Sequence, residues 1–201
     1  MIYWTLVSKS GQKEPRIKSQ TQAGVIASLE HVDVIVTRQK QFKVQAAIIK
    51  KICAEILYQV GLSGWELCVK FVSKVEIRKL NKQYREKDYA TDVLSFHQSE
   101  WKKPIRVGSS GRAKKTNFDI SVLGDIVICL DIALENAEKI GQSIDREVCF
   151  LLVHGVLHLC GHDHELEEDE VLMLEDQSKV MESFNRDLPV WKDCVRILEN
   201  N

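Results

Sequence analysis

Four of the six histidines in this chain fall within one short stretch, residues 153–164, which reads VHGVLHLCGHDH. The residues from Arg146 to Leu159 are apolar almost all round, which is typical of a helix buried in a core. His154 and His158 are four residues apart, so such a helix places them side by side on one face. Two neighbouring imidazoles in an apolar helix indicate a metal site, because neutral imidazole nitrogen is a good zinc ligand.

A third ligand requires the helix to end, because a continued helix would carry His164 away from the face of the pair at about 100° per residue. Gly161 is placed to end it, since glycine accepts the left-handed conformation found at helix ends. The chain can then turn, and we predict that His164 completes the ligand set. His162 is the rival third ligand. Cys160 is a poor candidate, because the same angular count places it on the opposite side of the helix.

The spacing His-x3-His-x5-His reproduces the ligand spacing of metzincin peptidases. Those enzymes carry a glutamate directly after the first histidine, as general base for the zinc-bound water. This chain has Gly155 there, which cannot accept a proton. Three histidines leave one coordination position of zinc open, which favours a catalytic site over a structural one. The pattern therefore predicts a catalytic zinc whose chemistry is not peptide hydrolysis by the usual route.

Composition limits the class of protein. The chain has 201 residues, enough for one domain with extensions, and 44% are hydrophobic. The formal net charge of -1 gives no general attraction for nucleic acid, so RNA binding would need a local basic patch. No apolar run approaches membrane-spanning length and the N-terminus lacks a signal-peptide core, so we expect no membrane association. The 6 cysteines form no C-x-x-C pair, which indicates buried thiols in a reducing cytoplasm.

Periodicity predicts alternating strands and helices. Strands are expected at residues 32–37, 65–71 and 123–129 and at the end of the polar stretch 84–96, and helices at 49–60, 73–84, 131–141, 146–159 and 167–184. Residues 1–31 are expected to be a loosely ordered N-terminal extension, and residues 187–201 a tail that contains a short helix. The expected fold is a small single α+β domain over residues 32–186, with a mixed, about four-stranded sheet packed by helices and the metal-binding helix in the core.

Helix caps and one basic segment add detail. Ser73 and Glu76 form a capping box, Asp131 caps the next helix, and Ser143 or Asp145 caps the metal helix. Between the two central strands, residues 101–115 hold six basic residues with glycine, serine and proline. This segment is either a solvated loop or an arm that grips RNA phosphates near the metal.

Three segments together resemble one family. Residues 154–164 (HGVLHLCGHDH) are similar to the HGxLHLxGYDH signature of the bacterial YbeY-type endoribonucleases, the rRNA maturation factors. Tyr84 and Arg85, with residues 91–96 (TDVLSF), resemble the second block of that family, and residues 123–128 (LGDIVI) resemble the third. The resemblance covers roughly residues 32–185.

This resemblance implies a small α+β fold, one zinc ion held by His154, His158 and His164, and a functionally important arginine at Arg85. It implies metal-dependent cleavage of single-stranded RNA in 16S rRNA 3′ end processing, ribosome maturation and ribosome quality control. RNA and ribosome or small-subunit assembly proteins would be the partners. His162 stands where the family usually has tyrosine, so the resemblance leaves the contest with His164 open.

The residue chemistry fits such an activity. Zinc can activate water for attack on phosphorus, and the guanidinium of Arg85 suits the charge that builds on the phosphate, unless Arg85 only makes a surface ion pair. Asp92, Asp125 and Asp163 could act as general base or as partners of the histidines, and the sequence does not choose among them. Two other functions stay open: a metallopeptidase with a non-standard general base, and a non-catalytic ribosome-assembly factor stabilised by zinc.

Overall fold

The computed structural model describes residues 28–37, 39–108, 121–163, 167–186 and 192–198. These residues form, in order, β1 (Val32–Val36), β2 (Phe42–Val44), α2 (Ala46–Gln59), β3 (Glu66–Val72), α3 (Lys74–Arg85), β4 (Val93–His97), β5 (Val122–Cys129), α4 (Leu130–Ile140), α5 (Ile144–Leu159), α6 (Glu167–Arg186) and β6 (Val195–Ile197). The main sheet has the order β1-β3-β5-β4, with β4 antiparallel and the other three strands parallel. The predicted α+β domain with a mixed four-stranded sheet is confirmed.

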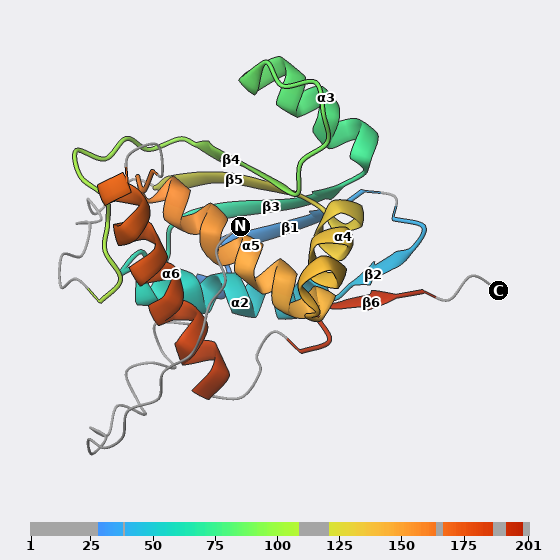
Figure 1. Ribbon diagram of the computed structural model, residues 1–201. Helices are drawn as coiled ribbons and strands as arrows, with labels where there is room; N and C mark the ends of the chain where they lie inside the picture. The colour runs from blue at the N-terminus through green and yellow to red at the C-terminus, as the bar shows by residue number, and fades with distance from the viewer. Residues whose placement is uncertain (1–27, 38, 109–120, 164–166, 187–191, 199–201) are drawn as a thin grey trace.

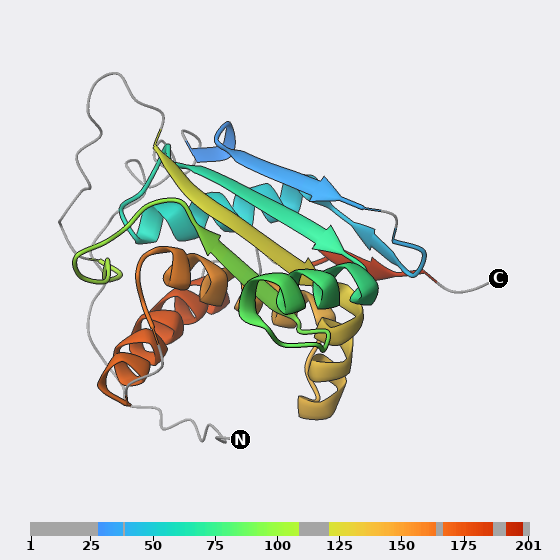
Figure 2. The same ribbon diagram turned by 90° about the horizontal axis from the view of Figure 1, so that it is seen from above.

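The helices divide unequally between the two faces of this sheet. Helices α2, α4, α5 and α6 lie on one side, which we call the covered face, and α3 stands on the other, which we call the open face (Figures 1 and 2). Strand β3 contributes side chains to both faces of the sheet, because successive side chains of a strand point to opposite sides. Its apolar residues on the covered face, packed into the main core, are Leu67, Val69 and Phe71. A smaller apolar cluster lies under α3 and consists of Val72, Ile77, Leu94, Val127 and Cys129.

Helix α5 runs through the main core, as predicted for the metal helix. Its N-cap is Ser143, whose side chain accepts a hydrogen bond from the backbone N–H of Arg146. Asp145, the other candidate cap, accepts instead from the backbone N–H groups of Asp193 (3.2 Å) and Val195 (2.8 Å). The carboxylate of Asp145 therefore fastens the C-terminal segment to the start of α5.

Gly155 brings α5 close to the sheet. A Cβ atom at this position would lie 2.9 Å from the Cδ1 atom of Ile126 and 3.1 Å from its Cγ2 atom. Ile126 belongs to β5 and is fully buried, so it has little room to yield. A side chain at position 155 would therefore force Ile126 to shift within the packed core, which favours glycine here.

Three local predictions need correction. Residues 195–197, expected in a tail with a short helix, form β6, which pairs antiparallel with β2; the stretch 187–191 lies outside the described residues. Asp131 lies in the first turn of α4, whose N-cap is Cys129. At the end of the expected extension, residues 28–31 join the domain: Ser28 is fully buried, and the carbonyl of His31 accepts from the backbone N–H of β3. Residues 1–27 lie outside the described part.

The cysteines and the helix lengths complete the description of the fold. All six cysteines are free, and five of them are buried. Across the described residues, none of the helices has both the length and the apolar character that a membrane span requires.

Candidate metal centre

The histidine pair of α5 has the geometry of two ligands that converge on one point. His154 and His158 are each half-buried, and their Nε2 atoms lie 3.1 Å apart. The two rings stand nearly at right angles, at 85°, with centroids 4.6 Å apart. The i, i+4 spacing thus brings the two rings together on one helix face.

Hydrogen bonds on the far side of each ring favour one tautomer of each histidine. The Nδ1 atom of His154 lies 3.1 Å from the amide oxygen Oε1 of Gln177 in α6. The Nδ1 atom of His158 lies 3.0 Å from the backbone carbonyl oxygen of His162. Both of these oxygens are acceptors, so the arrangement favours a hydrogen on each Nδ1. In neutral rings, both Nε2 atoms then carry lone pairs.

Two lone pairs at 3.1 Å repel unless a cation lies between or beside them. That cation is either a proton, which makes one ring an imidazolium, or a metal ion. A tetrahedral zinc ion with Zn–N bonds of about 2.0–2.1 Å separates two ligand nitrogens by about 3.3–3.4 Å. The observed separation is close to this value, so the donor set fits zinc.

The identity of the third ligand rests on residues at the edge of the described structure. His164 lies outside the described residues, and within them no group of three or more His, Cys, Asp or Glu is arranged to hold a metal ion. His162 is 3% exposed, and its Nε2 donates to the carbonyl of Ile105 at 2.9 Å. Burial lowers the pKa of His162, which keeps the ring neutral. Cys160 is fully buried and burial raises its pKa to about 12, so it is a core thiol.

The end of α5 is covered by the segment that follows β4. Gly161 has φ +85°, the left-handed conformation predicted for it, and a Cβ there would lie 3.1 Å from the Cβ of Trp101. The indole Nε1 of Trp101 donates to the carbonyl of Leu159 at 2.7 Å. The backbone N–H of Ile105 donates to the carbonyl of Cys160 at 3.0 Å. The turn that carries His162 is therefore held from outside the helix.

An ion pair fastens this same segment to α6. The Nε atom of Arg106 lies 2.6 Å from Oδ2 of Asp176, a fully buried carboxylate that also accepts from the backbone N–H of Val107. Arg106 is one of the six basic residues of the expected phosphate-gripping arm, and its guanidinium is used inside the protein instead. Lys102 and Lys103 are exposed, and residues 109–115 lie outside the described part.

Gln177 and Asp176 are the site residues that sequence reasoning missed. Both lie on α6 and are nearly or fully buried, at 4% and 0% exposure. A signal was present, because they interrupt an apolar stripe at helical spacing, Met173, Val180 and Phe184, which is fully or almost fully buried. A polar residue on such a stripe needs a buried partner.

Arg85 lies elsewhere. It is the exposed last residue of α3, the helix that stands on the open face in Figure 1, whereas α5 with the histidine pair lies on the covered face. The loop after it folds back on α3: Asn81 donates to the carbonyl of Tyr89, and hydrogen bonds from Arg78 and Lys82 lower the pKa of Asp88 to about 2. Among the described residues, none of the ion pairs involves Arg85, so its guanidinium is available to a ligand.

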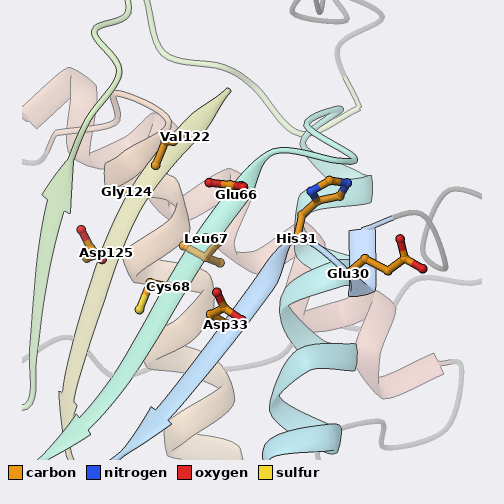
Figure 3. A pocket seen from close by; sticks show the side chains of 9 residues that line it. All are labelled: Glu30, His31, Asp33, Glu66, Leu67, Cys68, Val122, Gly124 and Asp125. Atoms are coloured by element: carbon orange, nitrogen blue, oxygen red, sulfur yellow. The ribbon is translucent and has the colours of Figure 1, made fainter. Parts of the chain in front are cut away.

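The three aspartates considered as general bases occupy different places. Asp92 holds the start of β4 to α4, accepting from the backbone N–H of Val93 (2.8 Å) and the side chain of Asn136 (3.0 Å). Asp125 faces away from α5, in a pocket on the open face where it stands in a row with Cys68 and Asp33 (Figure 3). Asp163 is exposed and follows the turn after α5, so it alone of the three lies next to the end of the metal helix.

The pocket of Figure 3 is separate from the histidine pair. Its lining comes from β1, β3, β5 and the turn before β1, and four of its side chains are carboxylates: Glu30, Asp33, Glu66 and Asp125. Acidic side chains repel phosphate groups, so this pocket is not suited to RNA.

Comparisons with known proteins agree with the sequence resemblance. The model of the family described as "Endoribonuclease YbeY" matches residues 34–185. A protein of that name from Caldanaerobacter subterraneus is 43% identical over 138 residues, 69% of this chain and 85% of the relative. Another, from a Thermoanaerobacter species, is 37% identical over 156 residues, 75% of this chain and 97% of the relative. The solution structure of TM1509 from Thermotoga maritima is 26% identical, with a TM-score of 0.50, and the match covers 80% of this chain and 89% of that one.

Proposed function

The chain belongs to the YbeY endoribonuclease family, and on that basis we propose that it is a zinc-dependent, single-strand-specific endoribonuclease. We propose 16S rRNA 3′ end processing, ribosome maturation and ribosome quality control as its role, with RNA and ribosome or small-subunit assembly proteins as partners. The observation that supports the zinc proposal is the 3.1 Å separation of the Nε2 atoms of His154 and His158, which is close to the separation of two nitrogen ligands on one zinc ion. Six free thiols favour the cytoplasm, a reducing compartment.

The proposed ligands are His154, His158 and His164. The commitment of His162 to the carbonyl of Ile105 favours His164 as the third ligand. When bound, zinc supplies a Lewis acid for the phosphate and activates water. The protein's own part is to hold both Nδ1 protons away from the metal, through Gln177 and the carbonyl of His162, and so to present two lone pairs. Asp163 is the proposed general base.

Arg85 is proposed to bind RNA from the open face. Because α3 and the metal helix lie on opposite faces of the sheet (Figure 1), we assign Arg85 to a phosphate that neighbours the reacting one on the same strand. Strand β4 is the sheet edge between the two sites: Phe96 of β4 contacts Tyr84 of α3, with ring centroids 5.1 Å apart, and β4 also lies against α5. A single RNA strand that crosses this sheet edge would contact both Arg85 and the histidine pair.

The two alternatives are less well supported. A peptidase with the usual base would need a carboxylate at position 155, where the chain faces the buried side chain of Ile126 and has no room for one. A zinc ion that only holds the fold is normally closed by four protein ligands, whereas the three proposed histidines leave one coordination position open.

The experiment that tests this proposal compares three substrates: single-stranded RNA, duplex RNA of the same sequence, and casein. Each is incubated with purified protein, with metal-stripped protein, and with stripped protein after zinc is added back. We expect cleavage of single-stranded RNA only, lost on stripping and restored by zinc. Cleavage of casein would favour the peptidase, and the absence of any cleavage by zinc-loaded protein would favour the assembly factor.

A further inference from the structure

A buried glutamine on α6 contacts the metal helix at the ring of a proposed ligand. Gln177 is 4% exposed, and its Oε1 lies 3.1 Å from Nδ1 of His154. It interrupts the buried apolar stripe of α6, where an apolar residue would avoid the cost of burying an amide. Its position therefore needs a reason beyond packing.

We propose that Gln177 is a positioning residue of the metal site, which fixes both the ring orientation and the tautomer of His154. The inference rests on the proposed zinc site and identifies what makes that site competent. An amide oxygen can only accept, so it selects the ring form with hydrogen on Nδ1. That form leaves the lone pair on Nε2, the atom that faces His158.

Without this acceptor, the buried Nδ1–H loses its partner, and the other tautomer becomes favourable. The other tautomer carries its hydrogen on Nε2, where it blocks a metal bond. Loss of such an outer partner typically costs about 10–100-fold in metal affinity. Gln177 is thus expected to act on metal binding through His154, without touching the metal or the RNA.

The two histidines are controlled by different kinds of group. The partner of His158 is the main-chain carbonyl of His162, which no substitution at 162 can delete. The partner of His154 is a side chain, so its contribution can be measured by substitution. Position 177 is therefore where the tautomer of a ligand can be changed while the ligand itself stays in place.

The test uses the full chain in four forms: wild type, Gln177→Met, Gln177→Glu and Gln59→Ala. Methionine keeps the length of the side chain but cannot accept strongly, whereas glutamate keeps the acceptor. Gln59 is the matched control, because its Nε2 donates to Oγ of Ser183 at 2.7 Å and so ties another helix to α6 away from the histidines. Zinc affinity is measured by competition with a chromogenic chelator, and the fold is checked by circular dichroism and thermal unfolding of the metal-free proteins.

We expect Gln177→Met to bind zinc about 10-fold or more weakly, and Gln177→Glu to bind at least as tightly as wild type. Gln59→Ala should bind zinc like wild type, even if its unfolding temperature falls. In zinc-loaded wild type, a slowly exchanging Nδ1–H signal of His154 should appear in proton NMR spectra; it should persist in Gln177→Glu and be lost in Gln177→Met.

The possible negative results contradict different parts of the argument for Gln177. A wild-type protein that binds no zinc overturns the proposed function and this inference with it. Wild-type protein that binds zinc no better than a folded Gln177→Met variant overturns the inference alone. If Gln177→Met does not fold, Gln177→Glu decides: folded protein with tenfold weaker binding would show that the acceptor is not what position 177 supplies.

Discussion

The two helices that carry the proposed functional residues are held in opposite ways. Helix α5, with the histidine pair, buries 11 of its 16 residues between the sheet and the other helices. Helix α3, with Arg85, buries only Ile77 and Asn81 of its 12 residues. The position of α5 is thus set by the main core, and that of α3 by a small apolar cluster and by exposed ion pairs such as Arg78 with Asp88, which contribute little because water screens them.

This difference matches the demands of the two tasks. A metal site needs its ligands held within a fraction of an ångström, which a close-packed helix provides. An arginine that meets a phosphate of a flexible strand needs exposure and reach, which an outlying helix provides. The comparison predicts that changes at the histidine pair and its packing alter metal binding or folding, and that a change at Arg85 alters RNA handling alone.

The largest expected effect concerns the ligand set on the covered face. His164→Ala should weaken zinc binding by more than the about 100-fold that loss of an outer partner costs. His162→Ala should weaken it less but lower the free energy of unfolding by about 1–3 kcal/mol, because the carbonyl of Ile105 loses its donor. Metal analysis and denaturant unfolding of both variants decide this. Equal metal losses, or a loss confined to His162→Ala, would overturn the assignment.

The next effect contrasts packing on the two faces. Gly155→Glu should lower the free energy of unfolding by at least about 3 kcal/mol, since it overpacks against Ile126 and buries a carboxylate. The matched control is Val75→Glu on α3, where the side chain is 65% exposed and the change should stay within about 0.5 kcal/mol. Urea unfolding measures both. Similar losses for the two variants would mean that the faces do not differ as described.

A smaller effect is expected at Arg85. Arg85→Ala should lower kcat/KM for single-stranded RNA about 10-fold or more, the value of one charge-assisted hydrogen bond, while zinc content and unfolding temperature stay unchanged. Arg85→Lys should recover only part of the rate, because a point charge replaces a fork. Steady-state kinetics with metal analysis test this. Wild-type kinetics in Arg85→Ala would remove Arg85 from the proposed RNA path, and an unfolded variant would contradict its exposed position.

The smallest effect concerns the basic segment beside the covered face. Replacing Lys102 and Lys103 with serine should weaken RNA binding and reduce the log–log salt slope by about 0.7 for each RNA phosphate that the variant no longer neutralises. Adding Lys114→Ser and Lys115→Ser extends the series. Turnover of short substrates at saturation should change little. The control is the double variant in which Lys51 and Lys139, exposed lysines of α2 and α4, are replaced with serine. If this control and the Lys102/Lys103 double variant show the same salt slope, the basic segment does not bind RNA.

Arg106 should behave differently from those lysines. The guanidinium of Arg106 contacts the buried carboxylate of Asp176. Replacing Arg106 should therefore lower the free energy of unfolding and leave the salt dependence of RNA binding unchanged. The sequence offered no basis for this distinction, since all six basic residues share one polar segment.

Local spacing was enough to predict much of this protein. The i, i+4 pair of His154 and His158, the left-handed Gly161 and a cap at either Ser143 or Asp145 depend on residues within a few positions of one another, and helix geometry alone brings them together. The alternation of buried and less buried side chains along β3 was likewise predicted from the alternation of apolar and polar residues in the sequence. The resemblance of three segments gave the family, which the comparisons confirm.

Tertiary structure decided the rest, because those contacts join residues far apart in the chain. The amide of Gln177 reaches a ring 23 positions away, and Asp176 pairs with an arginine 70 positions away. The need for glycine at 155 arises from Ile126 on another element, and the separation of Arg85 from the histidines arises from the face of the sheet on which α3 packs. Periodicity shows which side of an element is buried, but the partner it meets there depends on how the whole chain folds.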